Sequence, residues 1–329
     1  MSPLTLAAQA ADAADGANFA SFEVAPWQWA AFLALVAALL LVDVLVIHRR
    51  PHAVSLKEAA IESAVWITIG TAFTLVILAW HGSQAGGEYL AGYLIEKSLS
   101  IDNVFVWAVI LSYFKVPPQY QFRVLFWGIF GALVLRAVFI FAGVALIERF
   151  DFVLYFFGAL LLYSAFKIAR HQEAEVHPET SLVLKTVNKV VPSTDRYDGQ
   201  KMFTRVDGKR LATPLFAVLI MIESTDVVFA VDSIPAILAV SREPFIVFSS
   251  NAFAILGLRA LYFCLAGMAG RFRYLNIGLG AILAFVGVKM LIAEFYHFPT
   301  FLSLAVIAVV LTVAIVASLR ADKRERVGS

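Results

Sequence analysis

Residues 219–236 read LIMIESTDVVFAVDSIPA, an apolar stretch that nevertheless carries Glu223, Asp226 and Asp232. A helix places Glu223 and Asp226 on one face, because they are three residues apart. Asp232 falls on another face of an ideal helix, and Pro235 cannot donate the main-chain hydrogen bond that would continue the helix. We therefore expect a break near Asp232 that frees main-chain carbonyls and redirects its carboxylate.

A second stretch of the same kind, YLIEKSLSIDNVFVW at residues 93–107, carries Glu96, Lys97 and Asp102. Glu96 and Asp102 are six residues apart, which is also the separation between Asp226 and Asp232. Two serines lie between them, and the pattern is compatible with local unwinding, although no proline requires it. The two stretches therefore share the same spacing of acidic residues within an apolar segment.

They are the first parts of an internal repeat. SIDNVFVWA (100–108) aligns with STDVVFAVD (224–232), and this alignment matches Asp102 to Asp226. The pairs that follow in register are LVLRAVFIFAG (133–143) with LGLRALYFCLAG (256–267), which matches Arg136 to Arg259, and ERFDFVLYFFGALLLYSAFKI (148–168) with GRFRYLNIGLGAILAFVGVKM (270–290). Each copy holds three apolar spans, an odd number, so the second copy enters the membrane from the opposite side. We predict an inverted-topology repeat.

The amino-acid composition is that of a membrane protein. It is 61% hydrophobic and only 15% charged, with a mean hydropathy of +0.82, whereas soluble domains are about a quarter charged. Nine stretches are long enough to cross a hydrocarbon core of roughly 30 Å as helices. They are residues 27–47, 63–80, 89–114, 124–147, 152–168, 211–240, 246–268, 274–292 and 299–319. We predict an all-α polytopic membrane protein with about nine transmembrane helices.

Loop charges predict the orientation, because basic loops stay in the cytoplasm. The basic loops alternate with poorly basic ones along the chain, which places the amino terminus outside and the carboxyl terminus inside. The predicted parts are a 1–26 extracytoplasmic tail, spans one to five in 27–168 (first repeat 89–168), a 169–210 cytoplasmic loop, spans six to nine in 211–319 (second repeat 211–292) and a 320–329 cytoplasmic tail. The first residues lack a basic region before an apolar run, so we expect a tail rather than a cleaved signal. Within the loop, residues 182–191 suit either a short amphipathic helix or a flexible connector.

The candidate ligands are hard oxygen donors. They are Glu96, Asp102, Asn103, Glu223, Asp226 and Asp232. This donor set suits Mn²⁺, Mg²⁺ or Ca²⁺, whereas the single cysteine excludes an intramolecular disulfide and a thiolate metal cluster. The six histidines form no sequence cluster. We expect a transported ion rather than a resident cofactor.

The alternative is that these acids only neutralise buried bases. The two acidic stretches hold five carboxylates, against the three deep bases Lys97, Arg136 and Arg259. The surplus carboxylates must be protonated or hold a cation, so charge balance favours a site. Arg136 and Arg259 are expected to be structural counter-charges. Asp43, near the cytoplasmic end of the first span, suits a salt-bridge or topology residue as well as a gate.

These motifs resemble the TerC family of bacterial membrane proteins. The strings that carry the resemblance are VDVLVIHRR, EKSLSIDNVFV, GALVLRAVFIF, IESTDVVFAVDSIPAI, LGLRALYF and VGVKM. The resemblance implies a LysE-like transporter of the bacterial inner membrane that exports Mn²⁺ in exchange for protons, with a link to tellurite resistance. It also implies that the six candidate residues bind the metal and protons.

The leading hypothesis is therefore a secondary carrier that exports a divalent cation. The alternative is a non-transporting membrane partner in tellurite resistance or in metal loading of exported proteins, and a homo-oligomer or a secretion-linked partner fits either. We expect no enzyme, because HExxH, GxSxG and Walker motifs are absent from the sequence. We also expect no nucleic-acid partner.

Overall fold

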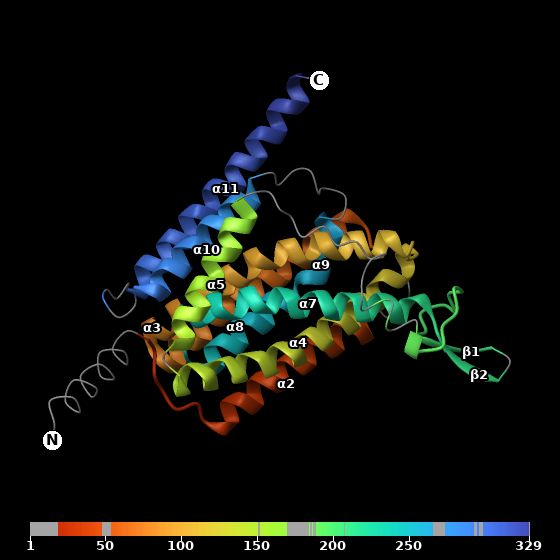
Figure 1. The fold of residues 1–329 in the computed structure, drawn as a ribbon, viewed down its shortest axis with the longest axis horizontal. Coiled ribbons are helices and arrows are strands. Elements are labelled where there is room, and N and C mark those ends of the chain that lie inside the picture. The colour runs from red at the N-terminus through yellow and green to blue at the C-terminus, as the bar shows by residue number, and fades with distance from the viewer. Residues whose placement is uncertain are drawn as a thin grey trace.

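The computed structural model describes residues 19–47, 54–150, 152–169, 184, 186, 189–206, 208–265, 274–292, 295 and 299–328. Helices dominate it (Figure 1). The helices are α2 (Pro26–Val42), a π-helical turn (Asp43–Ile47), α3 (Leu56–Tyr113), α4 (Pro118–Arg149), α5 (Phe152–Ala169), α7 (Pro214–Leu238), α8 (Pro244–Leu256), α9 (Leu258–Leu265), α10 (Leu275–Leu291) and α11 (Thr300–Gly328). The two strands are β1 (Phe203–Val206) and β2 (Lys209–Ala212).

The helices have the length and composition of a membrane protein. In the described part of the chain, six helical segments are long and apolar enough to cross a bilayer, and two shorter apolar helices, at 152–168 and 277–291, accompany them. Large apolar side chains are exposed on the outside of these helices, Leu75 and Val138 among them. The helical membrane fold is confirmed, while the number of spans, their orientation and the domain limits stay predictions.

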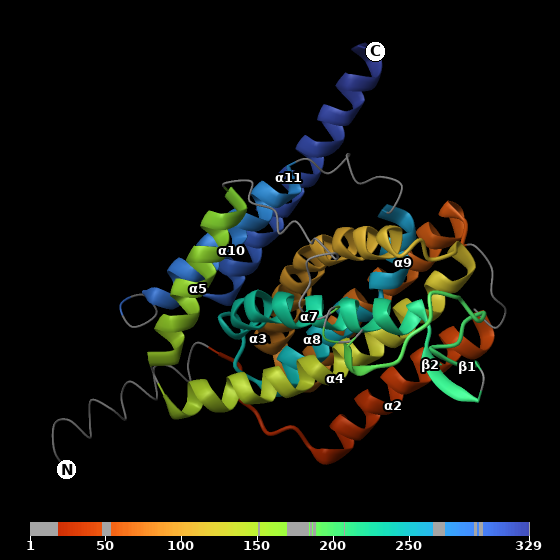
Figure 2. The same cartoon turned by 45° about the vertical axis from the view of Figure 1, so that its right-hand side comes forward.

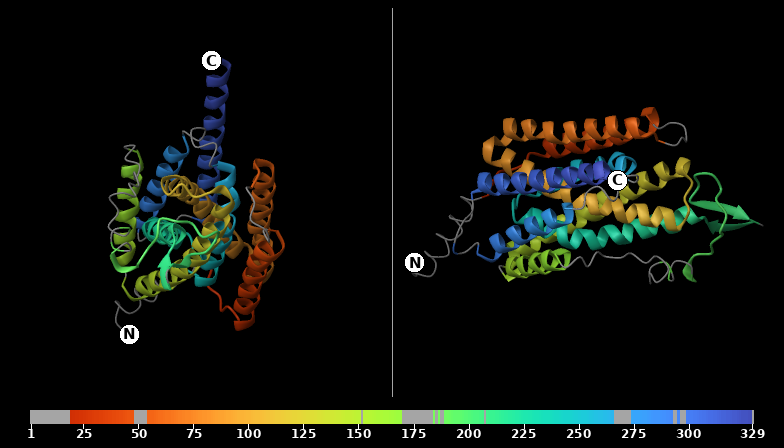
Figure 3. Two further views of the ribbon diagram at one scale, coloured as in Figure 1. Left: turned by 90° about the vertical axis from the view of Figure 1, so that its right-hand side faces the viewer. Right: turned by 90° about the horizontal axis from the view of Figure 1, so that it is seen from above.

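The longest helix, α3, is a helical hairpin. Gly82, with φ 86° and ψ −178°, has a non-helical backbone that L side chains rarely adopt. The Tyr89 hydroxyl donates a hydrogen bond of 2.8 Å to the carbonyl of Gly70. Nineteen residues of straight helix would separate these groups by about 28 Å, so the chain must reverse between them (Figure 3). The second and third predicted spans are thus the two halves of α3.

Helix contacts follow a pattern that an internal two-fold relation requires. The helix α3 packs on α8 and α9, α4 packs on α7, and α5 packs on α10. The predicted repeat matches α3 to α7, α4 to α8 and α9, and α5 to α10. Exchange of the two copies therefore turns the contact of α3 with α8 and α9 into the contact of α7 with α4, and it leaves the contact of α5 with α10 unchanged. The α5–α10 contact is tight, because a Cβ on Gly158 would lie 3.2 Å from the Gly287 carbonyl oxygen. This pairing supports the repeat, which stays a prediction.

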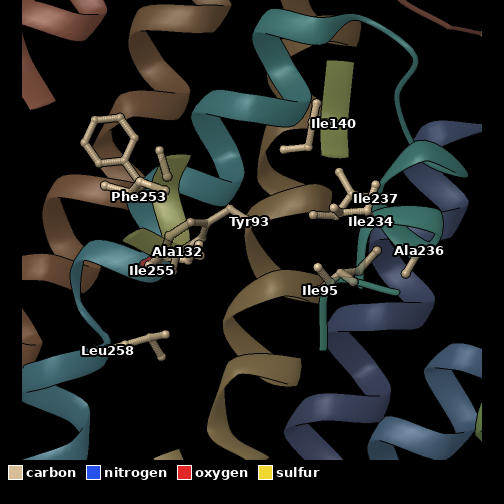
Figure 4. Close-up of a cluster of buried hydrophobic side chains, with 14 of the residues drawn as sticks. Tyr93, Ile95, Ala132, Ile140, Ile234, Ala236, Ile237, Phe253, Ile255 and Leu258 are labelled. Atoms are coloured by element: carbon tan, nitrogen blue, oxygen red, sulfur yellow. The ribbon is translucent and has the colours of Figure 1, made fainter. Parts of the chain in front are cut away.

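The apolar core lies between these helices. Figure 4 shows Tyr93 and Ile95 of α3 near Ile140 of α4, Ile237 of α7 and Phe253 of α8. All five side chains are almost completely inaccessible to solvent. Because these side chains come from four helices in different parts of the sequence, the core fixes the relative positions of the helices that carry the acidic stretches.

The helix break predicted near Asp232 is wrong, and the local unwinding that the sequence allows between Glu96 and Asp102 does not occur. The helix α7 continues through Asp232 and Pro235 to Leu238, and Gly82 is the one residue of α3 with non-helical torsion angles. Proline is tolerated in a membrane helix when neighbouring helices and side chains satisfy the freed backbone groups. The seventh predicted span is the one that divides, into α8 and α9 at Gly257, and the last helix continues beyond its predicted end at Leu319.

The long loop contains a β-hairpin that the predicted organisation lacked. Strands β1 and β2 pair antiparallel, with Phe203 opposite Ala212 and Val206 opposite Lys209. Gly208 has φ 77°, and the dipeptide Asp207-Gly208 is a sequence signal for a tight hairpin turn that we overlooked. Half of residues 182–191 lie outside the described residues, so the amphipathic helix stays an open alternative there.

Candidate cation site

Arg136 joins the two acidic stretches in the middle of the helix bundle. Its guanidinium donates to Asp226 of α7 through Nε to Oδ2, at 3.1 Å, and through Nη2 to Oδ1, at 2.9 Å. Its Nη1 donates to Glu96 Oε1 of α3 and, at 3.2 Å, to the Ser233 hydroxyl of α7. The helices α4 and α7, which carry Arg136 and Asp226, lie side by side (Figures 1 and 2).

Burial makes this cluster costly unless its charges are matched. Arg136 and Glu96 are 0% exposed and Asp226 is 2% exposed. The guanidinium matches the carboxylates through charge-assisted hydrogen bonds, which are stronger than bonds between neutral groups. Two carboxylates share one cation, however, and Glu96 Oε2 has no hydrogen-bond partner among the described residues. The cluster therefore carries excess negative charge when both acids are ionised.

Glu223 lies one turn from Asp226 on α7 and faces α4. A Cβ built on Gly131 of α4 would overlap the Glu223 carboxylate, so the glycine makes room for that group. One oxygen of Glu223 is buried without a hydrogen-bond partner in the described part of the chain. Glu223 is thus a neighbour of Asp226 at the edge of the cluster, whereas Glu96 and Asp226 are the two carboxylates that the Arg136 guanidinium contacts.

Two further predicted ligands, Asp232 and Asn103, form no hydrogen bond or ion pair with Arg136 in the described part of the chain. Asp232 accepts a hydrogen bond of 2.6 Å from the Ser164 hydroxyl of α5. Asn103 is buried in α3. The backbone of Asp102 is helical, but its side chain lies outside what the structure describes. Within the described residues, no three acidic, histidine or cysteine side chains are placed to share one metal ion.

Arg259, the repeat equivalent of Arg136, also joins two carboxylates. Its Nη1 and Nη2 donate to the two oxygens of Asp43, each at 2.5 Å, and Nη2 donates to Glu62 Oε1 at 2.6 Å. The Phe122 ring lies under the guanidinium, at 4.1 Å. Asp43 is therefore a salt-bridge partner in this structure. Glu62 was not predicted as a buried acid, because it lies immediately before the second predicted span.

A cavity of about 550 Å³ opens beside this second cluster, between α2 and the first half of α3. Its walls are mostly apolar, and Asp43 and Glu62 are among the residues that line it.

Lys97, the third predicted base, donates a hydrogen bond of 3.2 Å from its Nζ to the carbonyl of Ala254. Among the described residues, Arg136 of α4 is the base that forms ion pairs with Glu96 and Asp226.

Comparison with known proteins shows which family this sequence matches. Residues 81–326 match the TerC integral membrane protein family, and they contain both acidic stretches and both arginines. The chain belongs to the TerC family. The match confirms the resemblance inferred from the motifs.

Curated relatives of this TerC protein cover nearly its whole length. An uncharacterized membrane protein of Myxococcus xanthus, STKORF319, is 48% identical over 294 residues, which are 89% of this chain and 92% of that protein. A protein of Escherichia coli K12 named "Putative membrane-bound redox modulator Alx" is 47% identical over 292 residues, which are 86% of this chain and 91% of that protein. An uncharacterized membrane protein of Rickettsia bellii is 40% identical over 290 residues, 88% of this chain and 96% of that protein. No solved structure matches the chain.

Proposed function

We propose that this TerC-family protein is a secondary transporter of the bacterial inner membrane that exports a divalent cation, with Mn²⁺ as the leading candidate, in exchange for protons. Glu96 and Asp226 would hold the ion. The supporting observation is the convergence of these buried carboxylates, from the first helices of the two predicted repeats, on one guanidinium. Buried ionisable groups in membrane helices mark ion paths by default.

Arg136 acts in this proposal as a tethered cation. It occupies the space between Glu96 and Asp226 in this conformation, and it matches one of their two negative charges. A divalent cation competes with the guanidinium for the same oxygens, and protonation of a carboxylate weakens the hold on either. The carrier therefore exchanges metal and protons at one position, with Glu223 one turn away as an additional carboxylate.

The carboxylate oxygens favour a hard cation. Mn²⁺, Mg²⁺ and Ca²⁺ all accept such ligands, and Mg²⁺ loses its hydration water more reluctantly than Ca²⁺. Among the described residues, no cysteine or histidine joins the Arg136 cluster. We rank Mn²⁺ first because the TerC resemblance implies it, and the other two ions serve as competitors in the test.

The test is ion flux in proteoliposomes that contain only this protein. We expect an imposed pH gradient to drive Mn²⁺ movement by wild type, and Glu96→Gln and Asp226→Asn to abolish it. Glu148→Gln is the matched control, since Glu148 is an exposed acid at the end of α4. Absence of Mn²⁺, Mg²⁺ and Ca²⁺ flux by folded wild type would overturn the proposal and favour the non-transporting partner.

The name of the E. coli relative raises the question of a redox role. This chain has a single cysteine, Cys264, whose Sγ lies 3.6 Å from the Ser63 hydroxyl. One thiol cannot form an intramolecular disulfide, so dithiol chemistry within one chain is excluded. Any redox effect of this protein would follow from the ion that it moves.

A further inference from the structure

Glu88 is a buried carboxylate that the proposed ion site does not use. It lies on α3, six residues after Gly82, and its side chain is 0% exposed. Its Oε1 accepts a hydrogen bond of 2.6 Å from the main-chain N–H of Ala20. Its Oε2 has no hydrogen-bond partner among the described residues. Such a group is expensive to bury in a membrane protein, so it needs a reason.

Glu88 and Glu96 lie on one stripe of α3. Residues 88, 92 and 96 follow each other at intervals of four, so they occupy neighbouring positions along the same side of the helix. Glu88 is two turns, or about 12 Å, from Glu96. Gly92 lies between them, and the Ser250 hydroxyl of α8 approaches it closely. A Cβ at position 92 would lie only 3.0 Å from that hydroxyl oxygen. A polar atom therefore occupies the stripe midway between the two acids.

Residues 19–25 cover the Glu88 end of this stripe. The Phe22 ring stacks on His81, with centroids 3.7 Å apart, and His81 Nε2 lies 3.1 Å from Gln28 Nε2. The Phe19 ring lies 4.8 Å from the guanidinium of Arg242 and 5.8 Å from Lys289 Nζ. This end of the bundle is the one opposite the β1–β2 hairpin (Figure 1).

The charges around Glu88 decide which ion it suits. Lys289 of α10 interacts electrostatically with Glu88, Arg242 lies close to Lys289, and the polar side chains of Gln84 and Ser241 are also nearby. His81 and Tyr89 are the other titratable groups near Glu88 on this described part of α3. Two cationic side chains disfavour a second divalent cation here, whereas a carboxylate that binds and releases a proton is compatible with them.

We propose that Glu88 is the outer proton-binding residue of the exchange, which loads protons for delivery along the α3 stripe to Glu96. This inference rests on the proposed function. In each step one O–H bond breaks and another forms, from the Glu88 carboxyl through the Ser250 hydroxyl and bound water to the Glu96 carboxylate. Residues 19–25 cover the entrance, and their displacement opens it.

The experiment compares two kinds of Mn²⁺ movement in proteoliposomes. The first is Mn²⁺ flux driven by a pH gradient, and the second is exchange of labelled for unlabelled Mn²⁺ without a gradient. We expect Glu88→Gln to lower the first by about 10²-fold, the lower end of what a positioned proton-transfer group contributes. The exchange of Mn²⁺ for Mn²⁺ should stay close to wild type, because the glutamine keeps an oxygen for the Ala20 N–H.

Three comparisons make the result decisive. Glu88→Asp should recover part of the gradient-driven flux, Glu23→Gln on the same covering segment should leave both activities unchanged, and Glu96→Gln should lose both. Equal loss of both activities in Glu88→Gln would show a structural role and overturn the inference. Unchanged gradient-driven flux in that variant would also overturn it. Failure of wild type to move Mn²⁺ would instead overturn the proposed function.

Discussion

Arg136 and Asp226 face each other edge to edge, with two parallel hydrogen bonds of 2.9 and 3.1 Å between guanidinium and carboxylate. This bidentate geometry is specific to arginine, since a lysine offers a single ammonium group. The pair connects α4 to α7, which are far apart in the sequence, and Glu96 extends it to α3. One side chain therefore holds together three helices at the point where both acidic stretches meet.

Removal of the guanidinium should destabilise the protein strongly. Arg136→Gln leaves Glu96 and Asp226 buried together without a cation, and breaking a buried pair in this way costs about 3–5 kcal/mol. We expect a lower midpoint of thermal unfolding in detergent, followed by tryptophan fluorescence. Adding Asp226→Asn should recover part of the loss, because it removes one of the stranded charges.

Arg149→Gln is the control for that measurement, because Arg149 is an exposed arginine at the end of the same helix. It should change the midpoint little. If Arg136→Gln were as stable as this control, the guanidinium would not be the principal counter-charge of the two acids.

Gly131 offers a way to move one carboxylate without removing it. In Gly131→Ala, the new methyl group overlaps the Glu223 carboxylate, the far end of a flexible side chain that can turn aside. We expect a folded protein with reduced Mn²⁺ flux, similar in direction to Glu223→Gln. The measurement is initial flux at equal protein per liposome. Wild-type flux in Gly131→Ala, with Glu223→Gln impaired, would show that the position of this carboxylate is unimportant.

Hydropathy predicted the apolar helices, because it depends on a feature that repeats along the chain. The repeat matched Asp226 to Asp102, whereas the contacts in the structure join Asp226 to Glu96 through Arg136. Contacts that depend on tertiary packing were missed. Arg259 was expected to be a counter-charge, but its partner Glu62 lies just outside a predicted span. The break expected near Asp232 does not occur, because propensity rules for isolated helices underestimate the stability of a packed membrane helix. The helix α3 likewise stays intact between Glu96 and Asp102, where the sequence was compatible with unwinding.

The Arg259 cluster should respond unequally to loss of its members. Asp43→Asn leaves Glu62 to balance the arginine, whereas Arg259→Met strands two acids, so the arginine variant should be the less stable of the two. A double-mutant cycle by thermal unfolding in detergent measures the coupling between Arg259 and Asp43. Additive effects of the two substitutions would show that the pair, despite its short distances, contributes no coupling energy.

The loop before β1 should show a pH dependence of its own. The pKa of Asp198 lies below its ordinary value, because the carboxylate accepts a 2.7 Å hydrogen bond from the Thr204 hydroxyl and a 3.0 Å bond from Lys201. Because the pKa of Asp198 is lower in the folded loop, its ionised carboxylate stabilises the loop at pH values above the ordinary pKa of about 3.9. This stabilisation is lost as the pH falls through the pKa of the folded state. Protection of the β1–β2 amides from hydrogen exchange should therefore decrease at pH values below about 3.9. Asp198→Asn should remove this pH dependence, and a variant that kept it would assign the effect to another group.

Gly82 determines whether α3 can reverse. Its torsion angles lie in a region that is essentially restricted to glycine, so Gly82→Ala should cost about 1–3 kcal/mol although open space surrounds the position. Thermal unfolding in detergent measures the loss, and Ser83→Ala, at an exposed neighbour that already has a Cβ, is the control. The turn also places Glu88 beneath residues 19–25, so Gly82→Ala should weaken the contact between Ala20 and Glu88. A protease site introduced between residues 19 and 25 would then be cut faster in Gly82→Ala than in Ser83→Ala. Equal stability and equal cleavage of the two variants would mean that the reversal does not depend on the glycine.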